Sequence, residues 1–141
     1  MLAYAVTGAS GWLMMVLLLA IVLYPLLLRA GMLGPIQPFF KRLRLHYWMA
    51  YTFAGVLLLH LWVSMSGALA LGTSALGLDL ATIALVLVLV QIALGWQLRA
   101  PARSRRRVLR RRHFWVMLAL VACVLAHVAL NSGTLRMLFA I

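Results

Sequence analysis

Four long hydrophobic stretches alternate with short polar connections along the chain. They cover residues 10–28, 46–71, 78–98 and 113–130; none contains a lysine or an arginine, and the one acid stands at the very start of the third stretch. Because a helix needs about 20 mostly apolar residues to cross a bilayer, each stretch predicts one membrane-spanning helix. The pattern therefore predicts an all-α chain, with a single transmembrane domain over residues 1–141 that folds as an up-and-down four-helix bundle.

The connections contain residues that break helices. Between the first two stretches stand Gly31, Gly34, Pro35 and Pro38, and Pro101 follows the third stretch. The link between the second and third stretches is shorter, at residues 72–77. Proline is common in the first turn of a helix, and serine is common at the cap, so Pro38 and Ser104 are the expected starts of the second and fourth helices. Both starts would place the histidines that follow well inside their helices.

Charge is concentrated in two of the connections. The 141 residues include 13 Lys or Arg and one acid, Asp79, and 67% of the chain is hydrophobic. A soluble domain distributes charge over its surface, and a nucleic-acid-binding module needs its basic residues on a water-soluble face, so we expect neither. Cys123 is the only cysteine, which excludes an intrachain disulfide and a cysteine-based zinc or iron–sulfur site.

The basic residues also predict the direction of insertion. Cations beside spans stay on the cytoplasmic side, and twelve of the thirteen lie in the first and third connections, with only Arg136 elsewhere. Both connections share one side of a four-span chain, so both termini are expected outside, in a bacterial inner membrane. Arg29 follows the first stretch and no cation precedes it, so we expect a retained helix rather than a signal peptide.

The second and fourth stretches share a histidine pattern. His46 and His60 are separated by thirteen residues, as are His113 and His127, and both first histidines are followed by an aromatic pair. Fourteen steps of about 100° come within about 40° of four whole turns, so both histidines of a helix share a face, about 21 Å apart along the axis. The two stretches run in the same direction, so His46 is expected level with His113, and His60 with His127. The repeat predicts a duplicated helical hairpin.

Histidine inside a membrane is costly unless it has a partner, and no intramembrane carboxylate offers one. Neutral imidazole is a ligand of haem iron, so the two level pairs predict two bis-histidine haems. Gly55, with Ala122 at the matching place, is expected to leave room for a flat macrocycle. Arg44, Arg111 and Arg112 are candidates to pair with haem propionates, with plain membrane anchoring or docking of an acidic partner as alternatives. Asn131, Ser132, Ser64 and Ser66 are expected to cap helix ends or bond between helices, with propionate contact as the other use.

Two His-x13-His pairs on the second and fourth of four spans resemble the haem-carrying helix bundle of cytochrome b from the quinol-oxidising cytochrome bc complexes. The resemblance implies two haem b groups, electron transfer across the membrane as a subunit of a respiratory-chain oxidoreductase, other redox subunits as partners, and a link to quinone. The chain lacks the further spans of that family and its Pro-Glu-Trp-Tyr quinol motif. It also lacks the Gly-rich dinucleotide fingerprint that a ferric reductase would need.

These departures predict an electron-transfer subunit rather than a complete enzyme. Two alternatives stay open. One is a haem-free membrane anchor or scaffold subunit, and the other is the membrane domain of a metal or oxygen reductase.

Overall fold

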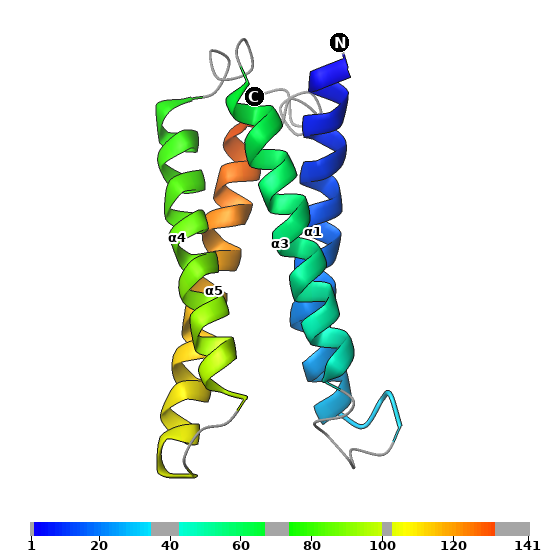
Figure 1. The fold of residues 1–141 in the computed structure, drawn as a ribbon, viewed down its shortest axis with the longest axis vertical. Coiled ribbons are helices and arrows are strands. Elements are labelled where there is room, and N and C mark those ends of the chain that lie inside the picture. The colour runs from blue at the N-terminus through cyan, green and yellow to red at the C-terminus, as the bar shows by residue number, and fades with distance from the viewer. Residues whose placement is uncertain (1, 35–42, 67–73, 100–102, 132–141) are drawn as a thin grey trace. The chain divides into compact units, whose positions relative to one another are not determined.

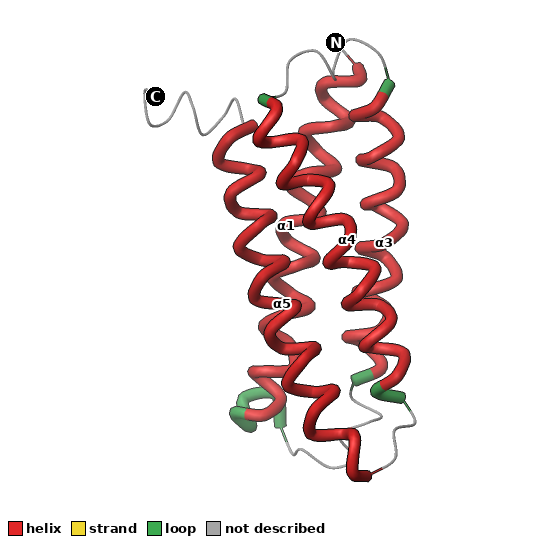
Figure 2. The backbone as a smooth tube through the Cα atoms, turned by 90° about the vertical axis from the view of Figure 1, so that its left-hand side faces the viewer, coloured by secondary structure: helices red, strands yellow, loops and turns green. Residues whose placement is uncertain are grey.

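A computed structural model describes residues 2–34, 43–66, 74–99 and 103–131 of the chain. These residues form α-helices and no strand, as Figure 2 shows. The helices are α1 (Leu2–Arg29), α3 (Arg44–Met65), α4 (Ala75–Gln97) and α5 (Arg103–Asn131). All four are long and apolar enough to cross a membrane. The predicted all-α class with four membrane-spanning helices is confirmed, and the chain has the make-up of an integral membrane protein surrounded by lipid.

The helices are paired as two hairpins of neighbouring helices (Figure 1). In Met1–Gly72, α1 packs along α3, and in Thr73–Ile141, α4 packs along α5. Within each hairpin the two helices run in opposite directions. Two hairpins of the same helix order are what a duplicated hairpin predicts, and they divide the chain into two compact units.

Large apolar side chains point outward along the helices, as expected where lipid replaces water as solvent. All five tryptophans are exposed, from 50% for Trp12 to 79% for Trp62. Trp48, Trp62 and Trp96 lie within two turns of a helix end, whereas Trp12 and Trp115 lie further inside α1 and α5. Exposed tryptophan near span ends is typical of the boundary between lipid tails and headgroups.

Helix α1 ends in a glycine turn at Gly31, whose φ of 74° is the left-handed conformation that glycine adopts without strain. The N–H of Gly31 donates to the carbonyl of Leu28, and that of Met32 donates to the carbonyl of Leu27. This pair of bonds is a Schellman motif, which satisfies carbonyls left over at a helix end. The prediction that glycine ends the helix here is confirmed.

The boundaries of α3 differ from those predicted. The helix begins at Arg44 after Leu43, so the predicted start at Pro38 is wrong, and Pro38 itself lies outside the described residues. His46 is therefore in the first turn. The helix ends at Met65 rather than at residue 71, because Ser66 is extended and its hydroxyl donates to the carbonyl of Val63 at 2.7 Å. This contact is helix-end capping, as expected for Ser66.

The second hairpin has longer helices than predicted. Ser74 caps α4, and its hydroxyl accepts the N–H of Gly77 at 3.0 Å, so Gly77 lies in the first helical turn instead of the connection. Helix α5 begins at Arg103, one residue before the expected start at Ser104, and most of the arginine run is helical. His113 is thus ten residues inside its helix, whereas His46 is at the edge of its own.

Candidate metal-ligand histidines

Each hairpin places its two histidines on the helix face that meets its partner helix. In α3, Phe53 stands seven residues from both His46 and His60, and seven steps of about 100° end within about 20° of two full turns. In α5, Leu120 stands in the same relation to His113 and His127. Phe53 is 6% exposed and Leu120 3%. Each helix therefore presents a stripe of histidine, large apolar residue and histidine, and all four imidazoles are half-buried.

His46 bonds to the backbone of α1. Its Nδ1 lies 3.1 Å from the carbonyl oxygen of Ile21, which can only accept, so Nδ1 carries the proton and donates. In a regular helix the Ile21 carbonyl would accept the N–H of residue 25, but that residue is Pro25, the proline inside α1. The imidazole thus takes the place of a missing backbone donor.

His60 bonds to a hydroxyl of α1. Its Nδ1 lies 3.0 Å from Oγ of Ser10, and that hydroxyl donates its single proton to the carbonyl of Thr7 at 3.1 Å. Ser10 Oγ therefore accepts from His60, and Nδ1 again carries the proton. A Cβ at Gly11 would stand 3.4 Å from Cε1 of the ring, so the glycine leaves room for this close approach.

His127 bonds to the backbone of α4. Its Nδ1 donates to the carbonyl of Gly77 at 2.8 Å. Nδ2 of Asn131 is also 3.2 Å from this nitrogen, but a protonated Nδ1 cannot accept, so we assign the Asn131 proton to the carbonyl of His127, at 3.2 Å. Oδ1 of Asn131 accepts from the N–H and the hydroxyl of Ser74, both at 3.4 Å. Asn131 therefore joins the two helices, as expected of interhelical bonding.

His113 differs from the other three because its Nε2 contacts a side-chain amide. Nε2 lies 3.2 Å from Nε2 of Gln91 on α4. Oε1 of Gln91 is buried and has no hydrogen-bond partner among the described residues. A half turn of the amide exchanges its nitrogen and oxygen, so this contact is compatible with either tautomer of His113. Gly95 flanks the ring, with a Cβ position 3.7 Å from Cε1.

One histidine contact lies at the same sequence position in the two hairpins. Both His60 and His127 bond to a residue 50 positions earlier, at Ser10 and Gly77. The same spacing of 67 residues separates His46 from His113, Phe53 from Leu120, His60 from His127, and Ser10 from Gly77. An interhelical contact that repeats with the histidines is what a duplicated hairpin predicts, although the contacts of His46 and His113 do not repeat.

Three of the four imidazoles fit the donor set of a bis-histidine haem, whereas Nε2 of His113 is in contact with the amide of Gln91. Nδ1 of three imidazoles is protonated and held, which leaves the Nε2 lone pair available for iron. Nε2 of His46 and of His127 makes no hydrogen bond to any described residue. Among the described residues no three His, Cys, Asp or Glu side chains gather as a metal cluster.

The other predicted site residues lie at different places relative to the histidines. Gly55 is exposed and lies about 180° around α3 from His46, with no heavy atom within 4 Å of where a Cβ would stand. Arg44, Arg111 and Arg112 are exposed and stand within two residues of a histidine. Arg106 is the arginine on the His113 face, seven residues earlier, and it is half-buried. Ser132 lies outside the described residues.

Sequence reasoning missed the partners of the histidines on α1 and α4. These partners are Ser10, Ile21, Gly77 and Gln91. A proline inside the first hydrophobic stretch was a visible signal for an unpaired carbonyl. Nothing in the sequence indicated which side chain would reach it.

Comparisons with protein-family models, with curated proteins and with solved structures find no match to this chain. The function is therefore argued from the chemistry of the histidines alone.

Proposed function

We propose that this protein is a b-type membrane cytochrome with two haems, in which His46 and His113 ligate one haem and His60 and His127 the other. The observation that carries the proposal is the pair of imidazoles on each histidine helix, on one face, with Nδ1 held by the partner helix in three of the four cases. Haem b with two axial imidazoles supplies one-electron redox chemistry.

The pairing follows from distance along the helix. Histidines fourteen residues apart lie about 21 Å from each other along the axis, far too distant for both to bind one iron. Each haem must then take one histidine from α3 and one from α5. The two irons would lie about 20 Å apart, so the haems together cover most of the hydrocarbon core. Electrons would pass between the two faces of the membrane through them.

The protein's own contribution is to bury, orient and space the ligands. In three of the half-buried imidazoles the partner helix holds Nδ1, which fixes the tautomer that leaves Nε2 for a metal. Arg44, Arg111 and Arg112 are exposed near His46 and His113, where a guanidinium would bind a propionate in a two-pronged contact.

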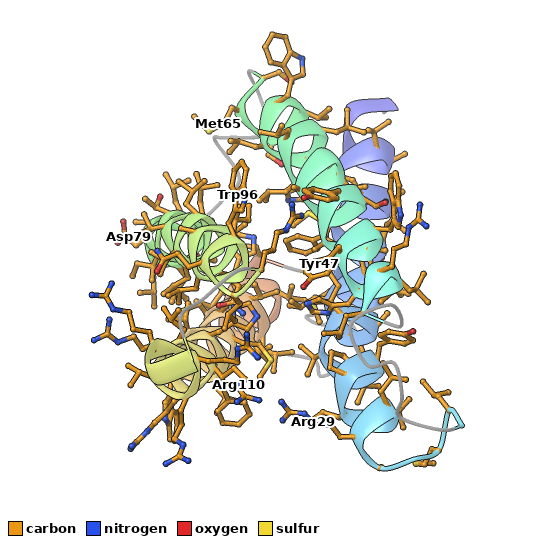
Figure 3. The ribbon with its side chains drawn as sticks, turned by 60° about the horizontal axis from the view of Figure 1, so that its bottom comes forward. Arg29, Tyr47, Met65, Asp79, Trp96 and Arg110 are labelled. Carbon is orange, nitrogen blue, oxygen red and sulfur yellow. The ribbon has the colours of Figure 1, made fainter. Side chains whose placement is uncertain are left out.

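We base the proposed orientation of the chain in the membrane on its basic residues. Figure 3 shows Arg110 on α5, where guanidinium groups gather, and Asp79 on α4. Arg99 lies over the ring of Trp96, with its guanidinium carbon 5.9 Å from the ring centroid. We propose that the arginine-rich end of this hairpin, where α4 ends and α5 begins, lies at the cytoplasmic face of a bacterial inner membrane, with both termini outside. Other redox subunits and quinone are the proposed partners, because the chain carries no dinucleotide-binding motif to supply electrons itself.

Counting haems in the purified protein tests the proposal. We expect two per chain and a sharp α band on reduction. His46→Ala should lose the cytoplasmic-side haem and His60→Ala the other, each leaving about half the haem. Thr52→Ala is the matched control, because Thr52 lies on α3 between the histidines and its exposed hydroxyl donates only within the helix.

The alternatives give different results. A spectrum without the α band, or equal haem in wild type and both histidine variants, would contradict the proposal and favour a scaffold subunit. Reduction of an added metal ion or oxygen by the isolated, reduced protein would instead favour a reductase domain.

A further inference from the structure

Pro25 is a helix-interior proline whose consequence falls on His46. Proline has no backbone N–H, and its ring crowds the carbonyl four residues earlier. Within a membrane a carbonyl without a donor is costly, because no water is present to replace the bond. The carbonyl affected is that of Ile21, and it is the atom that His46 Nδ1 reaches at 3.1 Å.

We propose that Pro25 is a positioning residue for the His46 ligand. By removing the helical donor from the Ile21 carbonyl, it creates the acceptor that fixes His46 as the Nδ1–H tautomer and leaves Nε2 for iron. This inference rests on the proposed function for the role of Nε2, but the hydrogen bond and the tautomer do not depend on haem.

The position of His46 near a helix end explains why its ring needs a further contact to hold it in place. His46 is the third residue of α3, where helix ends fray, whereas His60 and His113 lie well inside their helices. Its other ring contact is an edge-on approach to Tyr47, the next residue, with ring centroids 5.9 Å apart. The bond to α1 is therefore the contact that ties this imidazole to the rest of its hairpin.

Pro25 lies on the helix that packs against α3, four residues after the carbonyl that His46 reaches. Only the carbonyl four residues before a proline loses its donor, and neighbouring carbonyls point about 100° away around the helix. A proline one position later would free the carbonyl of Val22 instead. The match between Pro25, Ile21 and His46 is thus specific to one residue.

The experiment compares wild type, Pro25→Ala and the double variant Pro25→Ala/Leu26→Pro, all as full-length protein. Pro25→Ala returns an N–H to the Ile21 carbonyl, and the double variant keeps a proline in α1 while freeing the wrong carbonyl. The readouts are the ¹⁵N signals of labelled histidines without haem, which report the tautomer, and haem titration, which reports affinity at each site.

In wild type we expect His46 as a single Nδ1–H tautomer. Both variants should mix the tautomers of His46, leave those of His60 and His127 unchanged, and weaken haem binding at the His46 site about 10-fold, the lower end of the usual effect of losing such a partner. The lower end is expected because a carbonyl has two lone pairs and keeps a weakened bond.

The outcomes separate the two proposals. An unchanged His46 tautomer and unchanged haem affinity in Pro25→Ala would overturn the role of Pro25. Full recovery in the double variant would also overturn it, since a bend in α1 would then be sufficient. A wild type that binds no haem, yet loses its single tautomer in both variants, would support the hydrogen bond assigned to Pro25 and refute the cytochrome.

Discussion

The three imidazoles that donate through Nδ1 use three different acceptors. His60 uses the hydroxyl of Ser10, His46 uses a carbonyl released by Pro25, and His127 uses the carbonyl of Gly77, in the first turn of α4. The acceptors differ in their chemistry, but in all three rings Nδ1 carries the proton. A common tautomer reached by unlike partners indicates that the orientation of the ring, rather than any one contact, is the property that matters.

Ser10→Ala should weaken the site of His60. The ring would keep a half-buried Nδ1–H without its acceptor, so we expect about a 10-fold loss in haem affinity at the outer site and mixed tautomers of His60. Ser64→Ala is the matched control, because the Ser64 hydroxyl is buried and has no hydrogen-bond partner among the described residues. Haem titration checks both variants, and equal losses in the two would show that any buried hydroxyl matters equally.

Gly77→Ala should disturb the bonds around His127. A Cβ at Gly77 would collide with the side-chain amide of Asn131, which must then leave Ser74. Crowding of this kind costs about 1–3 kcal/mol, so we expect a lower unfolding temperature in detergent and loss of the outer haem. In Gly8→Ala the added Cβ meets nothing within 4 Å, and this variant should unfold at or above the wild-type temperature.

At the scale of elements, helix α5 continues from the arginine run into the membrane without a break. Its first turn contains no acid, and positive charge is unfavourable at a helix N-terminus, where the backbone dipole is itself positive. Asp79 stands near the start of α4, at the opposite end of this antiparallel hairpin, and cannot neutralise the run. The anions must come from lipid phosphates, from cofactor propionates or from a partner.

Replacing Arg105, Arg106, Arg107 and Arg110 by glutamine should therefore change how the chain inserts. We expect a mixture of orientations, because four of the eight arginines at the proposed cytoplasmic end of the second hairpin are lost. Reporter fusions at the C-terminus measure the fraction on each side. The same number of glutamines can be placed at exposed Thr52, Thr82, Leu58 and Leu89, a control that changes polarity without charge and should leave the orientation intact.

The elements also show what hydrophobic pattern can and cannot predict. Four apolar runs were sufficient to predict four helices, because a membrane leaves few alternatives to a helix. Pattern did not locate the start of α3 at Arg44, because a proline indicates only where a helix can begin. It could not find Ser10 or Gln91 as partners either, because small and polar residues are common in spans and their contacts depend on how two helices rotate against each other.

The chain as a whole consists of two helical hairpins, in which some of the positions that a duplication would match make different contacts. Ser10 and Gly77 correspond, and both accept from a histidine, whereas Ile21 and Gln91 are not matched and serve His46 and His113 differently. The contacts of His60 and His127 therefore lie at matching positions, whereas those of His46 and His113 do not. We therefore expect the two proposed haem sites to differ from each other. The two ligands of the proposed inner site, His46 and His113, should also differ more from one another than those of the outer site.

The pairing of histidines across the hairpins can be tested by combining substitutions. If His46 and His113 share one haem, His46→Ala, His113→Ala and the double variant should each lose the same haem, about half the total, because a site already empty has nothing more to lose. His46→Ala/His127→Ala removes one ligand from each proposed site and should lose nearly all haem. Haem content and the reduced spectrum measure both results. Loss that simply adds for His46 and His113, or half the haem surviving in His46→Ala/His127→Ala, would mean that imidazoles at different depths are partners, and the level arrangement would have to be abandoned.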